Sequence, residues 1–414
     1  MNAYKYFIIL YLKNNITVKS GLLKSILAIV ILLPITSYAQ TSLNGQVSTI
    51  TTGVPFLRIS PDARAGAMGD AGIAVSADAN AHYWNIAKVP FNEKNNGLSI
   101  TYTPWMRSLI PDISLIYLTA FHKFGADNNQ AISGSLRYFN LGDINFTDIN
   151  ASPIGTGKPR EMALDLGYSR KLSENLSAGV ALRYVYSNIS SGYAGNTDFN
   201  PGKAFATDLG VYYTKSKENA AAQKQTFSWG VVISNLGSKI SYSSIRKDFI
   251  PMNLGIGLAY TKEIDEYNKV TFALDFNKLL VPSLQIAKDT SGKAYYYYPD
   301  KGVIAGMMGS FSDAPGGLKE ELSEFTTSLG MEYWYQNKFT IRAGYFYEDP
   351  NKGARKYYTL GAGVKYNVMD LNFSYLISAG NTLIQNPLAN TLRVSLLFNF
   401  DSFDKVFGDG SSAE

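Results

Sequence analysis

The sequence predicts an all-β protein: a transmembrane antiparallel β-barrel of about 14 strands with an N-terminal hatch or plug segment. Three observations support this fold class. Segments of alternating apolar and polar residues recur along most of the chain, their apolar faces end in aromatic residues, and the connections between them alternate in length. After residue 40 no apolar run reaches the ~18 residues that a membrane-spanning helix needs, so strands rather than helices would cross a membrane.

The alternation is clear in the last of these segments. Leu392, Val394 and Leu396 point to one face, whereas Arg393 and Ser395 point to the other. A side-chain period of two describes a strand with one apolar and one polar face. Such segments, about fourteen by this criterion, lie near residues 97–103, 112–121, 130–140, 161–171, 174–187, 203–214, 226–235, 252–261, 267–278, 324–336, 338–348, 357–366, 369–378 and 391–400.

The polar faces are rich in Gly, Ser, Thr and Asn, and they also carry scattered charges. The charged positions are Arg137, Asp165, Arg183, Asp208, Asp275, Glu332, Arg342, Lys365 and Arg393. Strands of about ten residues with an aromatic-ended apolar face and a polar opposite face describe an outer-membrane barrel. The inward charges predict a wet or salt-bridged lumen.

A soluble β-sandwich would also have alternating strands, but its strands average about five or six residues. It would also have no reason to alternate long and short connections. Every second connection here is long, at 104–111, 141–160, 188–202, 236–251, 279–323, 349–356 and 379–390. Outer-membrane barrels place long loops outside the cell and short turns in the periplasm. An even strand count then puts both ends of the chain in the periplasm.

Residues 1–39 have the pattern of a cleaved signal peptide. They contain four lysines and no acidic residue, an apolar run at 26–35, and the small residues Ser37 and Ala39 just before Gln40. The run is too short for a membrane anchor. We therefore expect a signal peptide at 1–39, an N-terminal periplasmic or hatch segment at 40–96, the barrel at 97–400 and a flexible C-terminal tail at 401–414. The predicted location is the outer membrane.

Composition and motifs argue against catalysis. The chain has no Cys and only two His, and much of its net charge of +5 comes from the leader lysines. Disulfides, thiolate chemistry and nucleic-acid binding are therefore excluded. No GxSxG, HExxH or Walker A motif occurs, so we expect no catalytic residue, no metal and no cofactor. His82 could act as the base of a lipid esterase, but a lone His beside Tyr83 and Trp84 is more typical of packing or hydrogen bonding.

The most distinctive run precedes the first strand. It reads FLRISPDARAGAMGDAG from Phe56 to Gly72, and DANAHYWN follows from Asp78 to Asn85. The glycines allow close backbone packing, and the arginines of the run could pair with its aspartates in a polar lumen. Because larger barrels hold plugs, we expect this segment to fold into the barrel as a hatch.

This run resembles the N-terminal signature of the PorV/PorQ family, outer-membrane proteins of the type IX secretion system in Bacteroidetes. The family looks like a branch of the FadL-type barrels, and the length of the chain and its loop 279–323 are more similar to PorV than to the shorter PorQ. Ile86 departs from the signature, since Pro would be expected there. The signature and hatch residues are Arg58, Pro61, Asp62, Arg64, Gly66, Met68, Gly69, Asp70, Gly72, Trp84 and Asn85.

The resemblance implies cargo handling rather than catalysis. Implied partners are the SprA/Sov-like translocon barrel, cargo proteins with a C-terminal signal domain, attachment-complex proteins and outer-membrane lipid or lipopolysaccharide. The candidate contact residues, all in loop 279–323, are Tyr295, Tyr296, Tyr297, Tyr298 and Phe311. An aromatic girdle at the membrane interface explains the Tyr run equally well. The alternative function is a FadL-like transporter of hydrophobic small molecules, which the inward charges fit less well.

Overall fold

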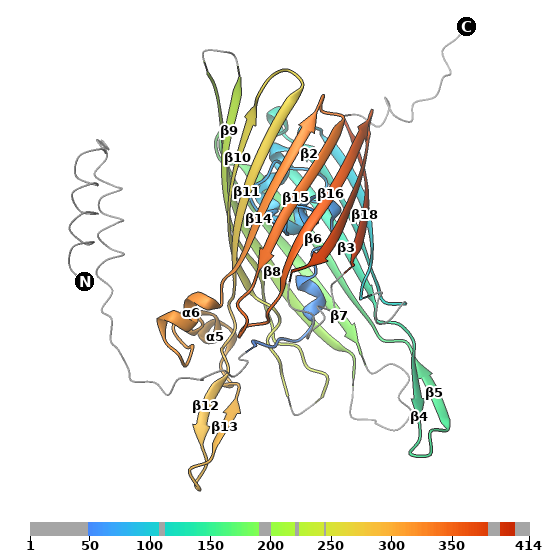
Figure 1. Cartoon of the computed structure of the whole chain (residues 1–414), viewed down its shortest axis with the longest axis vertical. Coiled ribbons are helices and arrows are strands. Elements are labelled where there is room, and N and C mark those ends of the chain that lie inside the picture. Colours follow the sequence, from blue (N-terminus) through green and yellow to red (C-terminus); the bar gives the residue numbers. More distant parts are fainter. Residues whose placement is uncertain are drawn as a thin grey trace, which may run out of the picture. The chain divides into compact units, whose positions relative to one another are not determined.

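The computed structural model describes residues 49–106, 112–189, 200–219, 223–243, 246–379 and 390–401. The predicted signal peptide and all of the predicted tail except Asp401 lie outside these ranges. Within them, fourteen antiparallel strands close into one barrel (Figure 1). The barrel strands are β1 (Asn96–Pro104), β2 (Ser114–Phe124), β3 (Gln130–Asn140), β6 (Arg160–Lys171), β7 (Leu176–Asn188), β8 (Gly202–Glu218), β9 (Lys224–Gly237), β10 (Asn253–Glu263), β11 (Asn268–Leu279), β14 (Thr326–Tyr335), β15 (Phe339–Tyr347), β16 (Lys356–Tyr366), β17 (Met369–Ser378) and β18 (Leu392–Phe400).

Pairing of the first and last strands closes the barrel. β1 and β18 pair in register from Asn96 opposite Phe400 to Tyr102 opposite Val394. All other neighbours are joined in chain order, so a closed sheet has no free edge. The predicted fold class is confirmed. No helix among the described residues is long and apolar enough to span a membrane.

The two faces of the wall differ as the alternation predicts. On β7, Leu182 faces outward and is 63% exposed, whereas its neighbour Arg183 faces the lumen and is 3% exposed. Every charged residue predicted to face the lumen is buried except Lys365, which is half-buried. The near-neutral hydropathy of the chain is thus an average over an apolar outer face and a charged inner one.

Short turns and long connections lie at opposite ends of the barrel. The β14–β15 turn is tight: Gln336 and Asn337 both have positive φ, and the Lys338 amide donates to the Tyr335 carbonyl at 3.0 Å. This is the geometry of a type I′ hairpin turn. The opposite end, called the long-loop end here, carries two small hairpins and two short helices (Figure 1). These are β4 (Ile144–Thr147) with β5 (Pro153–Gly157), β12 (Gln285–Lys288) with β13 (Ala294–Tyr297), α5 (Val303–Gly309) and α6 (Leu318–Ser323).

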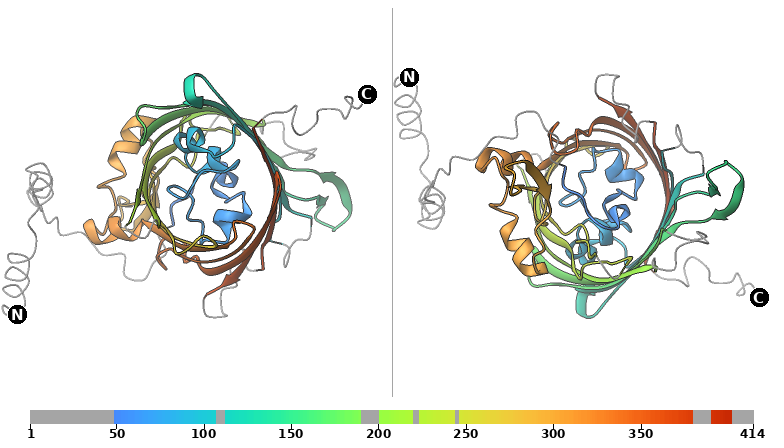
Figure 2. Two further views of the ribbon diagram at one scale, coloured as in Figure 1. Left: turned by 90° about the horizontal axis from the view of Figure 1, so that it is seen from above. Right: turned by 90° about the horizontal axis from the view of Figure 1, so that it is seen from below.

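The N-terminal segment fills the ring of strands, as both end-on views show (Figure 2). The segment is mostly irregular, with four short helical turns: η1 (Pro55–Arg58), α3 (Ala63–Gly66), α4 (Ala81–Trp84) and η2 (Ile86–Phe91). One further turn, η3 (Ala126–Asn128), joins β2 to β3. The predicted hatch therefore occupies the lumen.

The hatch runs along the lumen instead of staying at the short-turn end. Its first described residues reach the long-loop end, where the Tyr298 hydroxyl donates to the Thr49 carbonyl at 3.1 Å. Phe56 and Leu57 are buried there among Leu280, Val281 and other apolar wall residues. The apolar residues at the start of the segment therefore find their buried environment at the long-loop end. Toward β1, Ile86 and Val89 pack on Phe121 and Leu397.

Candidate functional site

A buried ion-pair network fastens the hatch to the wall. Arg64, on α3, donates from Nε and NH2 to the two carboxylate oxygens of Glu332 on β14, both at 2.9 Å. Glu332 also accepts from Arg342 Nε on β15 at 2.7 Å. Arg64 further contacts Asp78 of the hatch at 3.1 Å. The carboxylate of Glu332 thus lies between two guanidinium groups, which compensates charges that would be costly to bury alone.

The aspartates of the signature serve other purposes. The carboxylate of Asp62, after buried Pro61, accepts from the Ala65 amide at 3.0 Å and so caps α3; it also accepts from Trp84 Nε1 at 2.6 Å. Asp70 accepts from the Tyr357 hydroxyl at 2.5 Å. The sequence suggested that Arg58 and Arg64 could pair with Asp62 and Asp70. In the structure Arg64 binds Asp78 and Glu332 instead, and the closed barrel brings Glu332 to it.

The signature glycines lie where the hatch backbone closely approaches the barrel wall or the Trp84 ring. Gly69 has φ +66°, its amide donates to Thr359 Oγ1 at 2.8 Å, and a Cβ there would lie 2.6 Å from the Tyr345 carbonyl oxygen. A Cβ at Gly66 would lie 2.7 Å from Arg393 NH1, and one at Gly72 would overlap the Trp84 ring. Met68, fully buried beside Gly69, lies against Gly330 of β14. Gly69 is thus required for the close approach of the run to wall backbone, whereas Gly66 makes room for the Arg393 side chain and Gly72 for the Trp84 ring.

Two further contacts fix the second half of the hatch. Asn85 accepts from the Ala87 amide at 3.1 Å, which caps η2, and donates to the Val211 carbonyl at 3.0 Å. The amides of Gly72 and Ile73 both donate to Asp275 Oδ2, at 2.7 and 2.8 Å. The hatch signature is thus tied to strands on several sides of the barrel.

His82 lies in a second charged cluster. It is 2% exposed, its Nδ1 lies 2.8 Å from Ser133 Oγ, and its Nε2 lies 3.9 Å from Asp165. Asp165 accepts from Arg183 Nε at 2.6 Å, and Arg183 also pairs with Asp208 at 2.8 Å. His82 is therefore packed and hydrogen-bonded, as expected. No group of three or more metal-ligating side chains occurs among the described residues.

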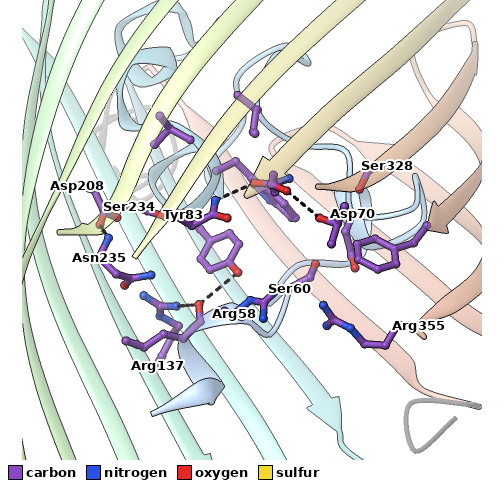
Figure 3. Close-up of a pocket in the computed structure, with 18 of the residues that line it drawn as sticks. Arg58, Ser60, Asp70, Tyr83, Arg137, Asp208, Ser234, Asn235, Ser328 and Arg355 are labelled. Carbon is purple, nitrogen blue, oxygen red and sulfur yellow. Dashed lines mark hydrogen bonds between the residues drawn. The ribbon is translucent and has the colours of Figure 1, made fainter. Parts of the chain in front are cut away.

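Between the hatch and the wall lies a polar cavity of about 110 Å³ (Figure 3). Its lining includes Arg58, Ser60, Tyr83, Arg137 and Arg355. Burial, together with the nearby charge of Arg355, lowers the pKa of Arg58 to about 10. The cavity is too small and too polar for a hydrophobic small molecule, since ligand pockets usually measure about 300–1,000 Å³ and are mostly apolar.

Arg355 closes the cavity on one side. Its Nε and NH2 donate to the two oxygens of Glu348 at 2.8 and 2.9 Å, a bidentate pair within the β15–β16 loop. Burial opposes ionisation of Glu348, but hydrogen bonds from Arg355 and the charges of Arg355 and Arg58 hold the pKa of this carboxyl below its usual value. Both groups therefore stay charged at neutral pH, and this side of the cavity is rigid.

A cluster of lysines and glutamates clamps the longest loop to the barrel rim. Lys278 pairs with Glu321 at 3.0 Å and with Glu324. Lys352 pairs with Glu320 at 2.5 Å and with Glu324 at 3.0 Å. Burial alone would lower the pKa of Lys352. The carboxylates of Glu320 and Glu324 raise it by more than burial lowers it, so the pKa of Lys352 is shifted upward. The sequence does not reveal this cluster, because nothing in the loop's composition marks which charges pair.

Removing the shared carboxylate should loosen this loop. In Glu324→Ala, the side chains of Lys278 and Lys352, 1% and 4% exposed, lose their common partner. Each lysine keeps one carboxylate, Lys278 that of Glu321 and Lys352 that of Glu320, so the cost is smaller than the about 3–5 kcal/mol of leaving a buried charge alone. We expect hydrogen exchange in 303–325 to become measurably faster. Lys319→Ala, at an exposed position of α6, is the control and should exchange as wild type. Unchanged protection in Glu324→Ala would show that the clamp does not hold the loop.

The candidate contact tyrosines lie on the small hairpin of the same loop. Tyr295 and Tyr297, 50% and 43% exposed, lie on β13 with ring centroids 6.1 Å apart. Tyr296 pairs through its backbone with Ile286 of β12. Tyr298 follows the hairpin and binds Thr49, while Phe311, 46% exposed, follows α5. The structure thus brings the four tyrosines together at the hairpin and puts Phe311 on a separate part of the loop.

These features define a class: an outer-membrane β-barrel with a lumen filled by an ion-paired hatch and with structured loops at one end. The family model described as "Type IX secretion system protein PorV" matches residues 42–286. The chain belongs to the PorV family and is an outer-membrane component of the type IX secretion system. Among curated proteins, none matches the chain.

Solved structures show distant similarity. The toluene transporter TodX of Pseudomonas putida is 12% identical, with a TM-score of 0.48, over 82% of this chain and 98% of that one. A FadL homologue of Pseudomonas aeruginosa is 12% identical, with a TM-score of 0.42, over 86% of this chain and 100% of that one. LpxR of Salmonella typhimurium is 9% identical, with a TM-score of 0.32, over 73% of this chain and 100% of that one. Such weak similarity implies nothing about ligand or activity.

Proposed function

We propose that the protein binds secreted proteins carrying a C-terminal signal domain and shuttles them from a SprA/Sov-like translocon barrel to the cell-surface attachment complex. One observation carries the proposal: the hatch fills the lumen through buried ion pairs, while aromatic and apolar side chains lie exposed on structured loops at the long-loop end. A barrel of this design has its accessible binding surface on the loops. That end faces outward by the rule for outer-membrane barrels.

The loops have the composition of a protein-binding surface. Tyr295 and Tyr297 lie exposed on the β12–β13 hairpin, which projects beyond the barrel strands (Figure 1). Tyr, Phe and Met are enriched at protein interfaces. Because the hairpin stands away from the strand ends, a partner surface accounts for its tyrosines better than a membrane girdle does. A two-stranded hairpin also has unpaired edges, which can accept a strand from a β-rich cargo domain.

The alternative, transport of hydrophobic small molecules, needs an apolar route. The described lumen instead contains buried charges on both hatch and wall, and arginines are among the residues that line the cavity between them. Burying an apolar ligand against charged groups gains little from the hydrophobic effect and disrupts their solvation. The lumen therefore favours the protein-handling role.

Deletion of the gene followed by proteomics of the medium tests the proposal. Cargo with a C-terminal signal domain should stay in the cell and return to the medium when the wild-type gene is restored. Normal secretion combined with lost uptake of a hydrophobic compound would contradict the proposal and favour the transporter. Co-purification with a very large barrel protein is the second expected result.

The hairpin itself can be tested in the complemented strain. Tyr295→Ser with Tyr297→Ser should lower cargo release at least about tenfold, because losing one aromatic anchor costs on the order of 2 kcal/mol and a tenfold effect corresponds to about 1.4 kcal/mol. Tyr267→Ser is the matched control, since Tyr267 is 54% exposed in the β10–β11 turn at the opposite end. Equal cargo release from the two variants would show that the hairpin is not part of the contact surface.

A further inference from the structure

The alternation of β11 places Lys278 on the outer, lipid-facing side of the barrel wall. Phe272, Leu274 and Phe276 face outward, toward lipid, and Asp275 between them faces the lumen. Lys278 continues the outward series, yet it is only 1% exposed. A charged side chain at this position needs a cover with compensating charge.

α6 supplies that cover. Lys278 Nζ lies 3.0 Å from Glu321 and also binds Glu324. Because Lys278 points away from the lumen, α6 lies on the outer side of the barrel wall. The end-on views agree, since both α5 and α6 lie outside the ring of strands (Figure 2).

α6 binds the wall close to its lipid-facing residues. Lys278 is two residues beyond the lipid-facing Phe276, which is about 7 Å along a strand. The headgroup region adds roughly 5–8 Å to each side of the hydrocarbon core. A helix this close to a lipid-facing residue falls within the depth of an interfacial layer.

The free faces of both helices are apolar. Ile304 and Met308, one turn apart on α5, are 61% and 62% exposed. Leu318 and Leu322, one turn apart on α6, are 69% and 62% exposed. The opposite faces are used inside the protein: Val303 and Met307 pack against buried apolar residues, and Glu321 binds Lys278. Clusters of exposed apolar side chains held in a fixed arrangement mark a surface that another apolar phase covers.

We propose that α5 and α6 form an interfacial collar that inserts Ile304, Met308, Leu318 and Leu322 into the outer leaflet of the membrane beside β11 and β14. Lipid is the occupant because the collar continues the lipid-facing surface of β11, and because short amphipathic helices lie in the plane of the interface with their apolar face down. The clamp on Lys278 and Lys352 gives these short helices the support that they lack alone. The collar fixes the height and direction of the β12–β13 hairpin above the membrane. This assignment does not depend on the proposed function.

Depth measurements with spin labels test the collar, and the absence of Cys from the chain makes them direct. Ile304→Cys and Leu322→Cys carry a nitroxide in the full-length protein in phosphatidylcholine nanodiscs. Phe272→Cys, 52% exposed on the outer wall, reports lipid contact, and Ile149→Cys, 100% exposed between β4 and β5, reports water. The ratio of collision with oxygen to collision with a water-soluble nickel chelate is the readout for each site.

We expect both collar sites to show high oxygen and low nickel accessibility, with ratios closer to position 272 than to position 149. The labels occupy exposed positions, so the fold is retained, and the position 272 control verifies insertion of the barrel. If 304 and 322 match position 149, the face lies in water and the collar is overturned. That result would leave the apolar face available for a protein partner. If the cargo-secretion experiments contradicted the proposed function, the expected depth ratios would be unchanged, so the two proposals are tested separately.

Discussion

Replacing Gly344 by leucine is expected to prevent the hatch from docking. Gly344 faces the lumen on β15, and a Cβ there would overlap the backbone of Met68 and Gly69. Backbone atoms cannot rotate away as a side chain can, and overpacking costs about 1–3 kcal/mol even where side chains can adjust. The ladders of β15 with β14 and β16 do not involve the side chain, so the barrel itself should still close. The expected product is a barrel with an undocked hatch.

Two measurements follow the undocked hatch. Conductance in planar bilayers should rise above wild type, and proteases should cleave within 49–95. Ala343→Leu is the control, because Ala343 is the next residue on the same strand and is exposed on the outer face. A Gly344→Leu protein with wild-type conductance and a protected hatch would show that the close contact is not needed.

The wall was predictable because its pattern is local. Alternation of residues such as Leu182 and Arg183 directly reports two environments, and no distant contact is needed to read it. The structure adds length at strand ends, as where β8 continues to Glu218 beyond the predicted 214. It also adds the β4–β5 and β12–β13 hairpins within segments predicted as loops, since segments so short have too few residues to show a period.

The hatch was predictable in position but not in its partners. Its glycines and arginines mark a packed polar segment, yet Arg64 binds Glu332, which lies 268 residues further along the chain. Only closure of the barrel brings the two together. The sequence instead favoured local pairs with Asp62 and Asp70. In the structure Asp62 caps α3 and Asp70 binds Tyr357. The direction of the segment was also not predictable, because it depends on where the apolar residues Phe56 and Leu57 find matching wall.

The clamp at the rim shows a third limit. Lys278 belongs by parity to the lipid-facing side of β11, and alternation alone would expose it there. Its burial depends on α6, a helix of six residues that has too little length to be predicted from periodicity. The residues that fix the loop could therefore be identified only from the structure.

Breaking the Arg64–Glu332–Arg342 network should have the second large effect. In Glu332→Leu, two guanidinium groups whose side chains are 9% and 1% exposed lose the carboxylate between them. Leaving a buried charge without its partner costs about 3–5 kcal/mol. We expect the temperature at which the folded barrel loses its fast gel mobility to fall, with faster hydrogen exchange in 63–78. Glu266→Leu in the exposed β10–β11 turn controls for loss of a negative charge.

A double-mutant cycle separates the network from simple loss of packing. Arg64→Met in the Glu332→Leu background removes one of the two charges that have lost Glu332, and Arg342 retains its 2.7 Å hydrogen bond to Asn372. The double variant should therefore be more stable than Glu332→Leu alone, which is the sign of direct coupling between contacting residues. Additive losses would instead mean that Arg64 and Glu332 act independently. In that case the hatch would be held by its backbone contacts at Gly69 and Gly72 and not by its buried charges.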